Sequence, residues 1–186
     1  MKKIIAGVDE VGRGSLIGPV YAAAVILKEK INTKLLKDSK LISKQDREKL
    51  NIYIKKNSYW SIGKASVKEI EKLNILNASL LAMKRAIKKL HKKPNLVIID
   101  GNKAPEIKNY NLKSIVKADL KIPSVSASSI IAKVSRDKFI TKLSKKFKNY
   151  GWETNCGYGT KKHLSALKRF GATHHHRKTF APLHKM

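Results

Sequence analysis

The sequence has 186 residues, a length that suits one domain with a substantial hydrophobic core. Hydrophobic residues make up 42% of the chain and charged residues 29%, which excludes a disordered protein and is typical of a globular one. The formal net charge is +28, from 41 Lys and Arg against 13 Asp and Glu, and such a charge attracts polyanions in a salt-dependent way. Nucleic acid is the leading candidate partner and an anionic membrane surface the weaker one, although biased codon usage is an alternative origin of the many lysines.

Cysteine content and hydropathy exclude several other classes. Cys156 is the only cysteine, so neither an intramolecular disulfide nor a cysteine metal cluster is possible. The apolar run before Asp9 is too short for the core of a signal peptide, and no apolar stretch reaches the length of a membrane span. We therefore expect a cytoplasmic protein without a membrane partner, and we expect it to be a monomer.

The N-terminal half alternates between strand and helix patterns. Apolar runs predict a first strand over residues 3–9 and a fully buried second strand over residues 20–27. A polar, irregular segment follows, and then Ser43 opens a helix that runs to about residue 56. Alternation predicts a third strand over residues 59–65, and helical spacing returns over residues 67–73 and from about 76 to 90.

The C-terminal half contains two more strand patterns and then becomes helical. We predict strands ending at Asp100 and over residues 112–116, a long helix over residues 126–147, and a last helix over residues 161–170 that Gly171 stops. No linker or repeat interrupts the chain. We therefore expect one domain over residues 1–186, with a helical C-terminal portion from roughly residue 150.

The octapeptide G-V-D-E-V-G-R-G, residues 7–14, places Asp9 and Glu10 directly after an apolar run. Magnesium in proteins is typically held by one or two carboxylates together with substrate phosphates. The glycines allow the backbone to approach a phosphate closely and to present its N–H groups. The other interpretation is a strand followed by a turn, which the two acids merely cap.

Acids follow three separate apolar runs: Asp9 with Glu10, then Asp100, then Asp119. Because mixed α/β sheets place functional groups at strand ends, these four side chains are candidates for one site. Four clustered carboxylates repel one another without a metal, whereas with two divalent ions they become ligands for in-line phosphoryl displacement. A turn or a helix cap explains any single one of these acids, but in a chain with few acids the three together favour a metal site.

Four further groups of residues are candidates with open alternatives. Ser39 and Lys40 could hold a phosphate, although a solvated loop explains them equally well. Asp137 is either a fifth metal ligand or, more in keeping with its neighbour Arg136, part of a structural ion pair. Tyr158, between two glycines, either stacks on a sugar or base or anchors the last helix. For His163 and the histidines at 174–176 we expect solvated or polyanion-facing side chains rather than zinc ligands.

Seven segments, in this order, resemble the ribonuclease HII family. They are G-V-D-E-V-G-R-G at 7–14, D-S-K at 38–40, I-I-D-G-N at 98–102, K-A-D at 117–119, S-A-S-S-I-I-A-K-V-S-R-D at 126–137, G-Y-G-T at 157–160 and H-R-K-T-F-A-P-L at 176–183. They cover nearly the whole chain, and the first and fifth are the most specific. Ala118 and Ser128 depart mildly from the family pattern, at positions that carry no metal ligand.

The resemblance implies an α/β, ribonuclease H-like fold with a mixed five-stranded sheet flanked by helices. It implies a two-ion Mg²⁺ or Mn²⁺ site whose metal ligands and catalytic residues are Asp9, Glu10, Asp100 and Asp119. It also implies that Gly12, Arg13 and Gly14 recognise a 2′-hydroxyl through their backbone, and that Tyr158 contacts the RNA–DNA junction. Asp137 matches a family position that we treat as supporting rather than catalytic.

The implied reaction is cleavage of the RNA strand in RNA–DNA hybrids and at ribonucleotides embedded in duplex DNA, leaving 3′-hydroxyl and 5′-phosphate ends. Two alternative functions are also compatible with the sequence. A non-catalytic basic nucleic-acid-binding protein explains the charge but not the acids that follow three strands. A DNA-junction nuclease with the same fold and carboxylates explains both.

Overall fold

The computed structural model describes residues 3–36 and 42–185, so the candidate residues Asp38, Ser39 and Lys40 lie outside the described residues. Five strands form one mixed sheet in the order β3-β2-β1-β4-β5. The central β1 pairs antiparallel with β2 and parallel with β4, while β3 and β5 form the two edges. This arrangement confirms the predicted mixed five-stranded α/β architecture. The strands are β1 (Ile5–Val11), β2 (Val20–Leu27), β3 (Ser58–Ala65), β4 (Leu96–Asp100) and β5 (Leu112–Ile115).

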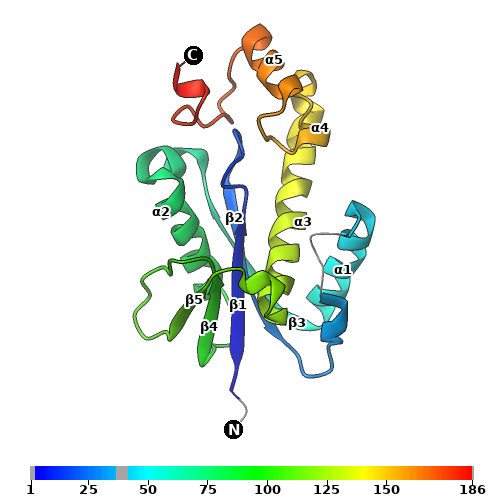
Figure 1. Ribbon diagram of the computed structural model, residues 1–186, viewed down its shortest axis with the longest axis vertical. Helices are drawn as coiled ribbons and strands as arrows, with labels where there is room; N and C mark the ends of the chain where they lie inside the picture. The colour runs from blue at the N-terminus through cyan, green and yellow to red at the C-terminus, as the bar shows by residue number, and fades with distance from the viewer. Residues whose placement is uncertain (1–2, 37–41, 186) are drawn as a thin grey trace.

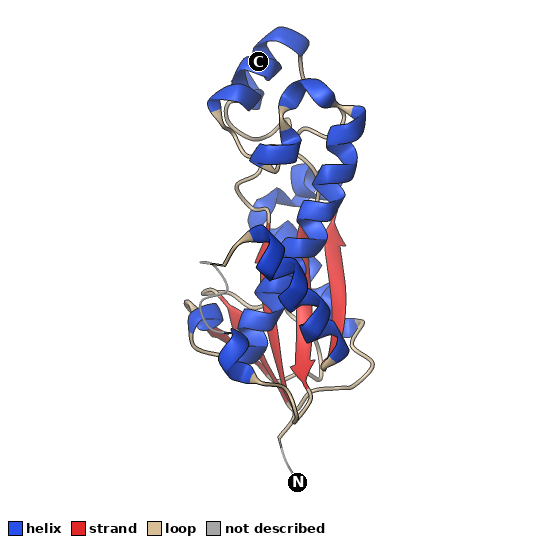
Figure 2. Cartoon of the chain, turned by 90° about the vertical axis from the view of Figure 1, so that its right-hand side faces the viewer, coloured by secondary structure: helices blue, strands red, loops and turns tan. Residues whose placement is uncertain are grey.

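Helices cover both faces of the sheet (Figures 1 and 2). The helix α2 (Val67–Lys88) packs on one face, and α1 (Lys44–Lys56) and α3 (Pro123–Lys146) pack on the other. Because side chains alternate along a strand, Ala6 and Val8 of β1 join the core under α2, whereas Gly7 between them faces α3. Short 3₁₀ segments, η1 (Thr33–Leu36) and η2 (Ala118–Leu120), precede α1 and α3.

The C-terminal portion forms a small helical layer beyond one end of the sheet (Figure 1). It contains η3 (Lys148–Tyr150), α4 (Trp152–Asn155), α5 (Lys161–Phe170) and η4 (Leu183–Lys185). Its core forms around the buried Trp152 and includes Leu16 and Ile17, which come from the segment just after β1. An isolated β-bridge pairs Ile17 with His176, so this layer is joined directly to the loop that follows β1.

Helix starts follow the expected capping chemistry. The Ser43 side chain accepts a hydrogen bond from the backbone N–H of Asp46 and begins α1, as predicted. Ser66 and Glu69 form a complete capping box at the start of α2. The two predicted helical stretches over 67–73 and 76–90 are one helix with a kink at Asn74, whose φ of 65° is not helical.

Several predicted boundaries were wrong. The first strand does not end at residue 9 but continues to Val11, because its antiparallel pairing with β2 extends to that residue. Asp9 and Glu10 therefore lie inside a strand rather than in a turn. The last strand ends at Ile115, and Asp119 lies in η2 instead of at the strand end. The long helix begins earlier than predicted, at Pro123, a residue suited to the first turn of a helix.

Candidate active site

The helix α3 lies unusually close to β1 because residue 7 is a glycine. A Cβ atom added to Gly7 would lie 2.2 Å from the backbone carbon of Ser124 and 2.2 Å from the nitrogen of Val125. Any side chain at residue 7 would push the helix away from the strand. The close approach positions the next turns of α3 over the following residue of β1 that faces the same way, which is Asp9.

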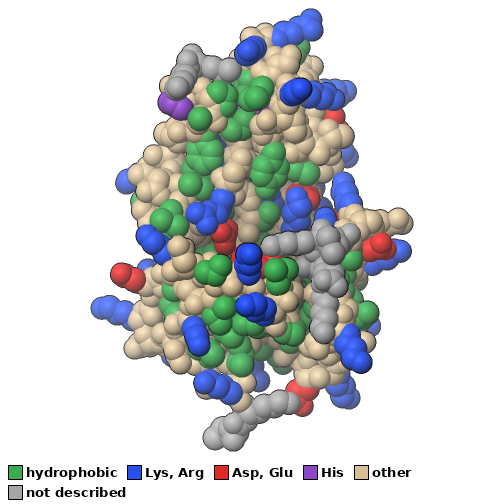
Figure 3. Space-filling model, in the orientation of Figure 1, with side chains coloured by type: hydrophobic (Ala, Val, Ile, Leu, Met, Phe, Trp, Pro, Cys, Tyr) green, Lys and Arg blue, Asp and Glu red, His purple; other side chains and the backbone are tan. Residues whose placement is uncertain are grey.

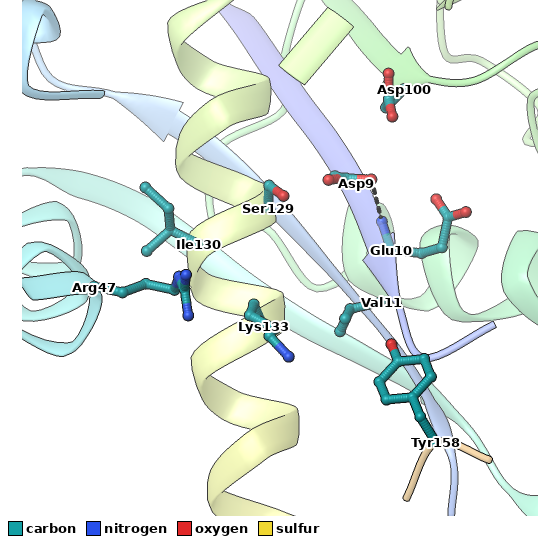
Figure 4. A pocket seen from close by; sticks show the side chains of 9 residues that line it. All are labelled: Asp9, Glu10, Val11, Arg47, Asp100, Ser129, Ile130, Lys133 and Tyr158. Carbon is teal, nitrogen blue, oxygen red and sulfur yellow. Dashed lines mark hydrogen bonds between the residues drawn. The ribbon is translucent and has the colours of Figure 1, made fainter. Parts of the chain in front are cut away.

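A cavity of about 360 Å³ opens at this place (Figure 4). Its walls come from β1, from the end of β4, from α1 and α3, and from the turn before α5, so segments far apart in the sequence meet here. The lining residues are Asp9, Glu10, Val11, Arg47, Asp100, Ser129, Ile130, Lys133 and Tyr158. In the view of Figure 3, acidic side chains near the middle of the molecule have Lys and Arg side chains around them.

The parallel pairing of β1 with β4 brings two of the predicted acids together. Val8 pairs with Ile99, so the next residues along the two strands, Asp9 and Asp100, lie at the same level and on the same face. The carboxylate of Asp9 accepts a hydrogen bond from the backbone N–H of Glu10 at 2.7 Å. The carboxylate of Asp100 accepts one from the backbone N–H of Ala118, also at 2.7 Å.

Burial and mutual repulsion make these acids difficult to ionise. Burial, the main cause, and the neighbouring Glu10 and Asp100 together raise the pKa of Asp9 to about 8, although hydrogen bonds from Ser129 and the Glu10 N–H partly oppose the rise. Burial also raises the pKa of Glu10, although the Arg13 guanidinium, 3.3 Å from its Oε1 atom, acts in the opposite direction. A bound cation would favour the ionised forms of both carboxylates.

The residues present fit a divalent cation that is shared with a substrate. The Oε2 atom of Glu10 is buried and has no hydrogen-bond partner among the described residues, as expected of an oxygen reserved for an ion. Within the part of the chain that the structure describes, no three acidic, histidine or cysteine side chains converge to hold an ion by themselves. Magnesium usually keeps water and takes only one or two carboxylates plus substrate phosphates, so two or three acids around an open cavity are sufficient.

Asp119 does not line the cavity, although it is next in sequence to a residue that contacts the site. It is buried in η2, directly after Ala118, whose N–H binds the carboxylate of Asp100. Its assignment as a fourth ligand stays a prediction.

The loop over residues 12–14 and Tyr158 lie beside the acids. Gly12 has a φ of 94°, a left-handed conformation that favours glycine, and the side chain of Arg13 is half exposed. Tyr158 is half-buried, lines the cavity, and has its ring 3.9 Å from where a Cβ on Gly14 would be. Because Tyr158 belongs to none of the apolar clusters of the described residues, its position favours the substrate-facing interpretation over the core anchor.

Three cavity residues had no role assigned from the sequence: Arg47, Ser129 and Lys133. Ser129 faces Asp9, and Lys133 lies one turn further along α3 beside Val11 (Figure 4); their i, i+4 spacing places both on one face of the helix. Nothing in the local sequence around Arg47 indicated the cavity. Asp137 forms an ion pair with Lys133 at 3.0 Å, which is the structural alternative named above.

The expectation of solvated histidines was wrong for His163 and His176. Both are fully buried in the C-terminal layer, where the Nε1–H of Trp152 donates to Nε2 of His163 at 2.9 Å. The reason is that these imidazoles serve as hydrogen-bond partners for buried polar groups, which sequence spacing does not reveal.

The fold and the cavity together define a class of protein, the ribonuclease H-like hydrolases, with carboxylates on two adjacent strands of a mixed sheet. The chain belongs to the ribonuclease HII family, whose sequence profile matches residues 6–184. It is 72% identical to ribonuclease HII of Pelagibacter ubique (strain HTCC1062) over 97% of both chains. It is 49% identical to that of Roseobacter denitrificans (strain ATCC 33942 / OCh 114), over 98% of this chain and 92% of the relative.

Comparison with solved structures supports the same family assignment. Ribonuclease HII in the PCNA complex from Archaeoglobus fulgidus superposes with a TM-score of 0.82 at 28% identity, covering 95% of each chain. Ribonuclease H2 from Pyrococcus horikoshii OT3 has a TM-score of 0.81 at 29% identity, over 97% of this chain and 95% of that one. The protein is accordingly an enzyme, a nuclease of the ribonuclease H type, from a metal-dependent family. Within residues 3–36 and 42–185, no helix combines the length and apolar character that a membrane span requires.

Proposed function

We propose that this enzyme cleaves the RNA strand of RNA–DNA hybrids and the 5′ side of ribonucleotides embedded in duplex DNA, leaving 3′-hydroxyl and 5′-phosphate ends. The observation that carries the proposal is the meeting of Asp9, Glu10 and Asp100 at one cavity, with Tyr158 at its edge and the loop over residues 12–14 next to it. In this proposal the three acids bind the cations, and the loop over residues 12–14 and the Tyr158 ring bind one nucleotide.

Asp9, Glu10 and Asp100, with Asp119 as the fourth candidate, would hold Mg²⁺ or Mn²⁺ between the protein and the scissile phosphate. A two-ion site supplies an activated water and stabilises the leaving 3′ oxygen of an in-line displacement. The hydrogen bonds from the N–H groups of Glu10 and Ala118 orient the carboxylates of Asp9 and Asp100 before substrate arrives.

The cations of the cavity would bind the substrate backbone. Lys133 on α3 and Arg47 on α1 lie opposite the acids (Figure 4), where they can neutralise phosphates without reading the sequence. Ser39 and Lys40, outside the described residues, stay candidates for the same role. The 2′-hydroxyl, both donor and acceptor, distinguishes RNA from DNA, and the backbone of residues 12–14 offers both kinds of group.

A duplex with a single ribonucleotide tests the proposal. Purified protein should cut the labelled strand with Mg²⁺ or Mn²⁺ and not in excess chelator, and it should leave a branched all-DNA junction intact. Absence of cleavage with either ion, in protein shown to be folded, would contradict the proposal. Cutting of the branched DNA alone would support the junction-nuclease alternative, and metal-independent binding without any cleavage would support a pure binding protein.

A further inference from the structure

Two arginines are fully buried directly beneath the candidate substrate site. Arg136, on α3, and Arg177, after α5, both have zero exposure. Among the described residues neither forms a salt bridge with a carboxylate. Burying an unpaired charge is strongly unfavourable, so the positions of these two side chains call for a compensating role.

Both guanidinium groups bind backbone carbonyls instead of acids. Arg136 donates from Nη1 to the carbonyl of Cys156 at 3.1 Å and from Nη2 to that of Ile17 at 3.3 Å. Arg177 donates from Nε to the carbonyl of Gly18 at 3.0 Å and from Nη1 to that of Arg13 at 2.9 Å. The four acceptors belong to only two segments, the one that follows β1 and the turn that carries Tyr158.

Arg136 also contacts both substrate-facing elements. A Cβ added to Gly12 would lie 2.2 Å from its Nε atom, so the backbone of Gly12 rests against the guanidinium. On the other side, the guanidinium carbon lies 5.6 Å from the centre of the Tyr158 ring, in reach of a cation–π interaction. One planar group therefore contacts both Gly12 of the loop and the aromatic ring.

The two arginines can position other parts of the protein, but they do not contact the nucleic acid themselves. Because both are fully buried, neither reaches a phosphate of a bound duplex directly. Burial and the charge of Arg136 together lower the pKa of Arg177 to about 9, so this side chain is still protonated at neutral pH. Lysine, a single ammonium on a flexible stem, cannot reproduce the fixed fork of donors that binds two carbonyls at once.

We propose that Arg136 and Arg177 are positioning residues that fix the spacing between the loop over residues 12–14 and the ring of Tyr158, and thereby the preference for a ribonucleotide. This inference rests on the proposed function of that loop and that ring. It assigns to the two buried charges a role in specificity that neither metal binding nor phosphate neutralisation supplies.

The variants Arg136→Lys and Arg177→Lys test the inference. For each, kcat and KM are measured on a duplex with one ribonucleotide, and Kd is measured on an all-DNA duplex of the same sequence. We expect kcat/KM to fall about 10- to 100-fold through misplacement of the loop or the ring. Affinity for the all-DNA duplex should stay within about twofold, because phosphate contacts are unchanged.

Arg85→Lys is the matched control. Arg85 binds Glu69 at 2.6 Å and the carbonyl of Lys64 at 2.7 Å, away from the cavity, so its loss destabilises the fold without moving the loop. It should keep kcat/KM on the ribonucleotide duplex. Folded Arg136→Lys and Arg177→Lys proteins that retain kcat/KM within about twofold would overturn the inference, as would an equal loss of affinity for all-DNA duplex.

A measurement on the unaltered protein covers the case in which these variants do not fold. In ¹⁵N NMR of the guanidinium groups, the Nη atoms of Arg136 and Arg177 should give separate, slowly averaging signals that shift with the ribonucleotide duplex and not with its all-DNA counterpart. Averaged signals like those of the exposed Arg169, or equal shifts with both duplexes, would overturn the inference. Failure of the unaltered enzyme to cut the ribonucleotide duplex would instead contradict the proposed function, which separates the two claims.

Discussion

The Nε2 atoms of His163 and His176 lie 3.2 Å apart in the buried core of the C-terminal layer. The N–H of Thr173 donates to Nδ1 of His176, so His176 carries its proton on Nε2 and donates it to His163. His163 also accepts from Trp152, and its protonated Nδ1 then donates to the carbonyl of Tyr158 at 2.9 Å. This chain of hydrogen bonds requires both imidazoles to be neutral, because an added proton would place two N–H groups face to face.

Acid should therefore destabilise the protein through this pair. Burial lowers the pKa of both histidines, and that of His176 falls to about 4, with His163 as the second cause. A histidine whose pKa is lower in the folded state stabilises the fold above its unfolded pKa, and this stability is lost as the pH falls from about 6.5 towards 4. We expect the loss attributable to His176 to be on the order of 2–3 kcal/mol, measured as the free energy of unfolding in urea across this pH range.

Two histidine variants control this prediction. His176→Gln should be less stable at pH 7 but should show a shallower dependence on pH, because the buried titrating group is gone. His91→Gln, at an exposed histidine, should show the same pH dependence of stability as the unaltered protein. Equal pH profiles for all three proteins would contradict the neutral-pair interpretation.

Asp9→Asn should abolish cleavage and stabilise the metal-free protein. The pKa of Asp9 rises from an ordinary value of 3.8 to about 8, so the folded protein binds an extra proton between these values and loses stability as the pH rises through them. Replacing the carboxylate with an uncharged amide removes this loss of folding stability at high pH. At pH 8 in chelator we expect a gain of about 1–2 kcal/mol, seen as a rise of roughly 2–8 °C in Tm by calorimetry.

Asp100→Asn should likewise abolish cleavage with the fold intact, whereas Glu106→Gln, at an exposed acid of a surface loop, should change neither activity nor Tm. A fall of many degrees in the Tm of metal-free Asp9→Asn would mean that this acid serves the fold as a cap instead of serving as a ligand.

Much of the fold could be predicted because its signals are local. The apolar run of β2, the Ser43 cap and the stop at Gly171 are each set by neighbouring residues, and the structure has them where they were predicted. The extension of β1 through Glu10 could not be predicted, because it depends on pairing with β2. The same holds for the burial of His163 and His176 and for Arg47 in the cavity, which depend on contacts between distant segments. That Asp9 and Asp100 could share a site was predicted from the apolar runs that precede them, but the parallel strand pairing that brings them together was visible only in the structure.

Tyr158→Ala should affect activity much more than stability, because the ring is half-buried and lies outside the apolar clusters of the described residues. The loss should be larger on a duplex with one ribonucleotide, where a single RNA–DNA junction must be found, than on a long hybrid. Tyr158→Phe should retain much of the activity if the aromatic face carries the contact. Rates on both substrates, together with Tm, are the measurement; equal losses on both with a lowered Tm would identify Tyr158 as an anchor of α5.

The most direct test of the whole account is to map the cut in one labelled duplex at single-nucleotide resolution. Three versions of the duplex differ only at one sugar, which is ribose, 2′-O-methylribose or deoxyribose. With Mg²⁺ or Mn²⁺, we predict a single cut on the 5′ side of the ribose, leaving a 3′-hydroxyl and a 5′-phosphate, and no cut in the other two duplexes. Cleavage of the all-deoxyribose duplex at the same position, or a cut that ignores the ribose, would contradict the assignment of the acids and the loop over residues 12–14 to one ribonucleotide-specific site.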